Sequence, residues 1–81
     1  MSSLSLYYYP SCGFCGMVRQ AAERAGVEME LRDIHTDQQH MKDLLDARGR
    51  RTVPVLRIDK GDGDVQWMPE SREIMAYLQT L

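Results

Sequence analysis

Cys12 and Cys15 are the only two cysteines of the 81-residue chain, and they stand three positions apart. They follow an apolar run over residues 4–9 and come at the start of a helical pattern. At a helix N-terminus, free backbone N–H groups and the helix dipole favour a thiolate over a thiol. Cys15 lies one turn further along the same helix face, within reach of a disulfide with Cys12. Thiol–disulfide exchange requires one thiol that attacks a disulfide and a second thiol that can resolve the mixed disulfide, and this pair provides both.

The composition restricts the other classes of function. A chain of 81 residues that is 43% hydrophobic and 27% charged is typical of one small globular domain over residues 1–81. Its net charge of −2 does not favour a nucleic-acid partner. Neither a signal peptide nor a run of transmembrane length is present in the sequence, which predicts no membrane partner and a cytoplasmic protein. In that reducing compartment the cysteine pair is expected to be catalytic, redox-sensing or metal-binding.

The elements that must position the cysteines follow from hydrophobic periodicity and from Gly and Pro punctuation. We expect strands over 4–9, 27–32, 53–58 and 64–68, with helices from Gly13 to Gly26, from Thr36 or Asp37 to Gly49, and from about Pro69. The second helix should bury Met41, Leu44 and Leu45, and the last helix Ile74, Tyr77, Leu78 and Leu81. The order β-α-β-α-β-β-α predicts an α/β fold: a four-stranded mixed sheet with helices on both faces, opened by a parallel β-α-β unit.

Three separated motifs, in this order, resemble the glutaredoxin branch of the thioredoxin fold. They are the strand over residues 4–9, Cys12-Gly13-Phe14-Cys15 at a helix start, and Thr52-Val53-Pro54 opening the third strand. A further segment, Met68-Pro69-Glu70-Ser71 followed by Ile74 and Tyr77-Leu78, is most similar to transferase-like glutaredoxins and to the N-terminal domain of glutathione transferases. The resemblance covers nearly the whole chain.

The resemblance implies a role for each motif. Cys12 would be the nucleophile and Cys15 the resolving thiol. Pro54 matches the family's cis-proline, which would present the Val53 backbone to glutathione. The remaining implied contacts are the glycyl carboxylate with Arg50 and Arg51, the γ-glutamyl carboxylate with the helix start at Ser71, and the ammonium group with Glu70. The implied glutathione site is Cys12, Phe14, Arg50, Arg51, Val53, Pro54, Glu70 and Ser71.

The sequence also departs from the family pattern. Gly13 and Phe14 are similar to the monothiol, cluster-binding branch, although that branch has serine where this chain has Cys15. No Lys or Arg precedes Cys12, a region where both branches commonly carry a lysine. Arg48 is explained by the negative end of the second helix dipole.

The expected function is that of a glutathione-dependent thiol–disulfide oxidoreductase acting on glutathionylated and disulfide-containing proteins, as a monomer. One alternative is an iron–sulfur carrier or sensor, in which two chains bridge a [2Fe–2S] cluster through Cys12 and bound glutathione. Another is a redox-gated binding module with poor turnover. A structural zinc site with His35 and His40 is disfavoured, because residues 16–34 form an ordered unit between Cys15 and His35. Both histidines are expected to be polar residues at the start and outer face of the second helix.

Overall fold

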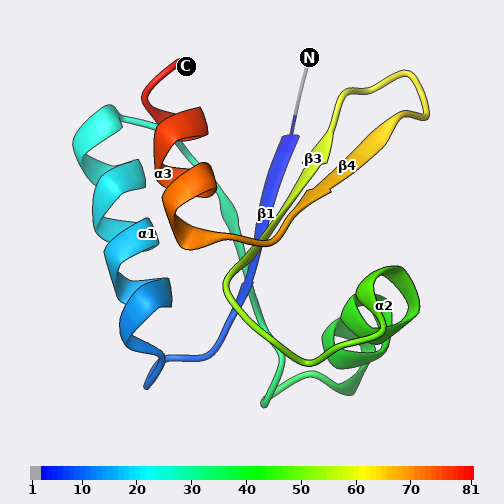
Figure 1. The fold of residues 1–81 in the computed structure, drawn as a ribbon. Helices are drawn as coiled ribbons and strands as arrows, with labels where there is room; N and C mark the ends of the chain where they lie inside the picture. Colours follow the sequence, from blue (N-terminus) through cyan, green and yellow to red (C-terminus); the bar gives the residue numbers. More distant parts are fainter. Residues whose placement is uncertain (1–2) are drawn as a thin grey trace.

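The computed structural model describes residues 3–81 (Figure 1). The elements are β1 (Ser3–Tyr8), α1 (Gly13–Ala25), β2 (Glu30–Asp33), α2 (Gln38–Arg48), β3 (Val55–Asp59), β4 (Val65–Met68) and α3 (Ser71–Leu78). Their order is the β-α-β-α-β-β-α order expected from the sequence. Within residues 3–81 no helix has the length and apolar character needed to cross a membrane.

The four strands form one mixed sheet in the order β2-β1-β3-β4. β1 pairs in parallel with β2, whereas β3 pairs antiparallel with both β1 and β4. In Figure 1, α1 and α3 lie side by side over one face of the sheet and α2 covers the opposite face. The predicted architecture, with helices on both faces, is therefore confirmed, and β1 is a central strand as its apolar sequence requires.

Each face of the sheet has its own hydrophobic cluster. The first joins the sheet to α1 and α3; its buried members are Leu4, Leu6, Val18, Ala22, Leu56, Ile58, Ile74 and Leu78. The second lies under α2; its buried members are Tyr7, Ile34, Leu44 and Val55, with Trp67 packed against them. Because consecutive side chains of a strand point to opposite faces, β1 supplies Leu6 to the first cluster and Tyr7 to the second.

The helix boundaries follow local signals in the sequence. α1 and α2 end at Gly26 and Gly49, both in the left-handed region with φ of 69°. That conformation is accessible to glycine without the steric cost that a Cβ would bring. Asp37 caps α2, because its side chain accepts a hydrogen bond of 2.9 Å from the Gln39 N–H. The predicted start and end of both helices are confirmed to within a residue or two.

Some expected strand limits were wrong. The second strand was expected over 27–32 but forms only over Glu30–Asp33, because Val27 follows the α1 C-cap directly and its N–H bonds to the Ala22 carbonyl at 2.9 Å. The third strand was expected from Val53, but it begins at Val55, after a cis peptide bond between Val53 and Pro54.

For three side chains, the environment predicted from the sequence was wrong. Leu45 was expected to be buried but is 38% exposed, because the buried stripe of α2 is narrow and centres on Leu44. Leu81 is 59% exposed, since α3 ends at Leu78 before that position. His40 was expected on the outer face of α2, yet its ring packs edge-on against Tyr7 with the ring centroids 6.2 Å apart.

Candidate active site

The Cys12 sulfur occupies the N-cap of α1. It accepts a hydrogen bond of 3.2 Å from the Cys15 backbone N–H. The loop is fixed on both sides, because the Cys12 N–H bonds to the Tyr9 carbonyl and the Cys12 carbonyl accepts from Gly16, each at 3.1 Å. The first turn of α1 carries no acidic side chain. The free amides and the positive end of the helix dipole therefore act on this sulfur without opposing charge.

The two thiols differ in environment. Cys12 is partly exposed, whereas Cys15 is only 1% exposed and packs in the interior. Burial, reinforced by a hydrogen bond with the Cys12 side chain, raises the pKa of the Cys15 thiol to about 12. Cys15 is therefore protonated near neutral pH, and of the two thiols only that of Cys12 is accessible. This difference agrees with an attacking Cys12 and a resolving Cys15.

A groove of about 490 Å³ is built from three segments that are distant in sequence. α1 contributes Phe14, the end of α2 and the segment before β3 contribute several residues, and the start of α3 closes it. Its lining residues are Phe14, Arg48, Arg50, Thr52, Val53, Pro54, Pro69, Glu70, Ser71 and Arg72. The groove contains the Val53–Pro54 peptide, which is cis as expected from the family resemblance.

The groove brings together six residues of the site expected from the sequence: Phe14, Arg50, Val53, Pro54, Glu70 and Ser71. Cys12 is not one of its lining residues, although it stands two positions before Phe14. Arg51 is exposed and does not line the groove. The sequence reasoning missed Arg48 and Arg72 as groove residues. The sequence did offer a sign of their position, because Arg48 lies two positions before Arg50 and Arg72 directly follows Ser71.

The N-terminus of α3 is not capped by its own side chain. Glu70 occupies the N-cap position but makes no side-chain capping bond. The first helical hydrogen bond runs from the Ile74 N–H to the Glu70 carbonyl at 2.9 Å, so the amides of residues 71–73 precede it. This helix start, on the groove wall, has the donors and dipole that suit an anionic group.

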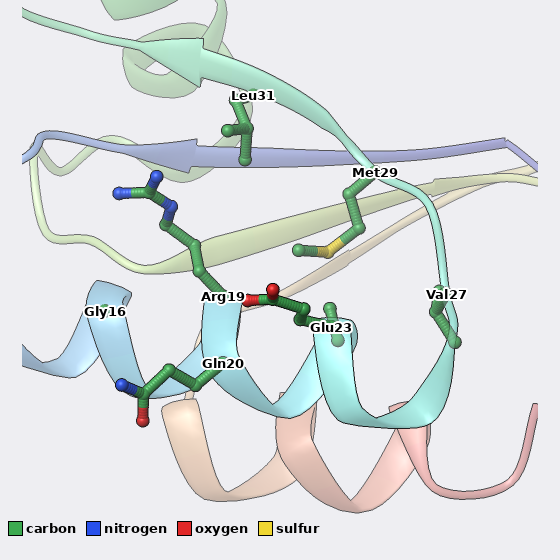
Figure 2. A pocket seen from close by; sticks show the side chains of 8 residues that line it. Gly16, Arg19, Gln20, Glu23, Val27, Met29 and Leu31 are labelled. Atoms are coloured by element: carbon green, nitrogen blue, oxygen red, sulfur yellow. The ribbon is translucent and has the colours of Figure 1, made fainter.

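A second hollow, of about 500 Å³, lies between α1 and β2. Figure 2 shows the Arg19 side chain extending from α1 toward β2, while Leu31 of β2 and Met29, just before β2, point toward α1. Neither cysteine lines this hollow. The groove beside the cis bond, which adjoins the N-terminus of α1, is therefore the better candidate for the reactive site.

The described residues do not form a metal site on their own. Across residues 3–81, no three His, Cys, Asp or Glu side chains gather closely enough to hold a metal ion. The zinc arrangement of Cys12, Cys15, His35 and His40 is therefore absent from this part of the chain. His35 instead stacks on Tyr9, with the ring centroids 4.5 Å apart.

Solved structures similar to this chain include several glutathione-dependent enzymes. A maleylacetoacetate isomerase from Anaeromyxobacter dehalogenans, solved with bound glutathione, is 25% identical with a TM-score of 0.72; the match covers 98% of this chain and 37% of that one. A trimeric glutathione transferase from Leishmania is 28% identical with a TM-score of 0.78, over 96% of this chain and 17% of that one. This chain thus spans about a third or less of these enzymes.

A thioredoxin-like protein of similar length is 22% identical, and its TM-score of 0.72 over 94% of this chain and 99% of that one supports the shared fold. No curated protein matches the sequence. The family profile described as Glutaredoxin matches residues 4–62, which include both cysteines and the cis-proline. This chain belongs to the glutaredoxin family.

Proposed function

We propose that this protein is a glutathione-dependent thiol–disulfide oxidoreductase that reduces protein–glutathione mixed disulfides. The observation that carries the proposal is the Cys12 sulfur at the N-cap of α1, where it accepts the Cys15 N–H bond at 3.2 Å. The thiolate is the reacting form in disulfide exchange, and Cys12 is partly exposed, where a substrate disulfide can reach it. The buried, protonated Cys15 leaves Cys12 as the attacking group.

In the proposed reaction, the Cys12 thiolate attacks the glutathione sulfur of a mixed disulfide. The bond between that sulfur and the protein substrate breaks, and the substrate thiolate leaves with the electron pair and takes up a proton. Glutathione then remains on Cys12 as a new disulfide. A second glutathione thiolate attacks this glutathione sulfur, which releases glutathione disulfide and returns Cys12 as a thiolate.

The groove beside the cis bond offers a complementary site for glutathione. The Val53 backbone, next to Pro54, would pair with the extended cysteinyl unit. Arg50 would take the glycyl carboxylate through its guanidinium. The uncapped start of α3 at Ser71 would take the γ-glutamyl carboxylate, and Glu70 the ammonium group.

Cys15 would serve a second route, the reduction of protein disulfides. After Cys12 joins one substrate sulfur, Cys15 loses its proton, attacks the Cys12 sulfur and releases the substrate thiolate. An intramolecular Cys12–Cys15 disulfide results. Because burial raises the pKa of the Cys15 thiol, this step needs a base to take the proton, and the departing substrate thiolate is such a base.

The test is turnover of a glutathione mixed disulfide with glutathione and glutathione reductase. Cys12→Ser should abolish turnover, because an alcohol does not supply the nucleophile. Cys15→Ser should retain it, because this reaction needs one thiol. Retained activity in Cys12→Ser with loss in Cys15→Ser would reverse the assigned roles, and an inactive wild-type protein would refute the proposed function.

Cluster binding is a second candidate, favoured by the surroundings of Cys12. Phe14 and Met17 are 63% and 49% exposed beside the motif, and a Cβ built at Gly13 meets no atom within 4 Å. This open, apolar surface gives room for a second copy of the chain, so that two Cys12 and two glutathione thiols would hold an iron–sulfur cluster. Anaerobic reconstitution with iron, sulfide and glutathione should then give a coloured dimer, lost in Cys12→Ser. A colourless monomer would exclude this candidate.

A further inference from the structure

The groove beside the cis bond is positive, although the chain as a whole carries a net charge of −2. Three guanidinium groups line it, those of Arg48, Arg50 and Arg72, against the single carboxylate of Glu70. The uncapped N-terminus of α3 adds further positive character. An anionic ligand is therefore favoured at this groove over a neutral or cationic one.

These arginines are not engaged with carboxylates of the chain. Elsewhere, Arg32, Lys42, Arg57 and Lys60 each form an ion pair with an Asp or Glu. Among residues 3–81, no such pair involves a groove arginine. In addition, the Nε of Arg48 is buried and has no hydrogen-bond partner in the described chain. The described chain therefore offers no fixed acceptor to the Arg48 guanidinium.

Glutathione alone does not balance these charges. It carries two carboxylates and one ammonium group, and in the proposed mode Arg50 and the start of α3 take the carboxylates while Glu70 takes the ammonium. Arg48 and Arg72 remain in the same groove without a carboxylate partner. The other half of the mixed disulfide, which is the protein substrate, can supply carboxylates to both.

We propose that Arg48 and Arg72 select disulfide substrates with acidic side chains beside the reacting cysteine. This inference rests on the proposed function, since it assigns a substrate class to the same groove. Arginine provides a bidentate fork for a carboxylate, and Phe14, which is 63% exposed, offers an adjoining apolar contact. The favoured segment is thus an acidic peptide around a cysteine.

The test compares two peptides that differ only in charge. Each contains one cysteine linked as a disulfide to thionitrobenzoate, flanked by Glu in one peptide and by Gln in the other. Attack of the Cys12 thiolate on the peptide sulfur forms the Cys12–peptide disulfide and expels thionitrobenzoate, whose absorbance gives the rate. No glutathione takes part, so the result is independent of glutathione turnover.

The Glu peptide should react about tenfold faster than the Gln peptide at low salt, and the ratio should fall toward one in concentrated salt. Arg48→Gln and Arg72→Gln should each lower the ratio about two- to fivefold, the range of exposed ion pairs. Arg24→Gln is the matched control, because it removes the same charge from the exposed end of α1. Its ratio should equal that of the wild type.

Equal rates for the two peptides in the wild-type protein would overturn the inference, and so would an equal loss of preference in Arg24→Gln. These outcomes are separable from failure of the proposed function. Turnover of glutathione mixed disulfides without a preference for Glu would refute only the substrate class. A preference for Glu without any such turnover would support the acidic recognition and refute the glutathione-dependent activity.

Discussion

The buried Cys15 thiol should react far more slowly than an ordinary cysteine. The variant Cys12→Ser tests this directly, because Cys15 is then the only cysteine of the chain. An ordinary cysteine with a pKa of 9.0 is about one-tenth thiolate at pH 8, whereas a pKa of about 12 leaves about one part in ten thousand. Alkylation by iodoacetamide requires the thiolate. In Cys12→Ser the burial of Cys15, the largest cause of the raised pKa, remains, whereas the hydrogen bond and charge of the Cys12 thiol are lost. Folded Cys12→Ser should therefore react more than tenfold, and at most about a thousandfold, more slowly than the same protein unfolded in urea.

Mass spectrometry of timed samples measures the alkylation rates of the folded and unfolded protein. Repeating the measurement at several pH values tests whether the raised pKa of Cys15 causes the difference. In folded Cys12→Ser the rate should still rise about tenfold for each pH unit at pH 9.0, where the rate of an ordinary cysteine begins to level off, because burial keeps the pKa of Cys15 above that value. Cys15→Ser is the control, since its remaining thiol is partly exposed at the helix start and should react in the folded state. Folded and unfolded rates for Cys15 within tenfold of each other would refute the reasoning.

Two further pairs of variants test the fold by urea unfolding. Leu44→Ala should lower the free energy of unfolding by about 2–5 kcal/mol, because Leu44 is fully buried under α2. Leu45→Ala, at a 38% exposed neighbour, should cost less than half as much, and equal losses would contradict the assigned faces of α2. Gly49→Ala should destabilise by about 1 kcal/mol, since φ is 69° there. Gly16→Ala should instead stabilise the protein by about 0.5–1 kcal/mol, because Gly16 lies inside α1 with open space for a Cβ. A lower free energy of unfolding in Gly16→Ala would contradict this open helical position.

The features that the sequence predicted well are those determined by neighbouring residues. Gly26 and Gly49 end their helices because a left-handed residue is a local requirement. Asp37 caps α2 through an amide two positions away. The order of strands and helices follows from periodicity in the same way, and connection rules then restrict the sheet to few topologies.

The features that it missed depend on contacts between distant segments. Leu45 has the same apolar character as Leu44, and only the packing of α2 on the sheet decides which one is buried. His40 packs on Tyr7, 33 positions earlier in the chain, so its own sequence surroundings carried no sign of that contact. Arg48 and Arg72 share a groove only after α2 and α3 have docked on opposite sides of the sheet.

The sulfur that caps α1 is also the sulfur proposed to react, and this links redox state to thermodynamic stability. A thiolate is a charged acceptor for the Cys15 amide, whereas a disulfide sulfur is neutral and a weak acceptor. Oxidation of Cys12 therefore weakens the helix cap, and reduction restores it. By linkage, whatever the cap contributes to folding also favours the reduced protein over the oxidised one. Folding therefore makes an oxidised Cys12 easier to reduce than the same cysteine in the unfolded chain.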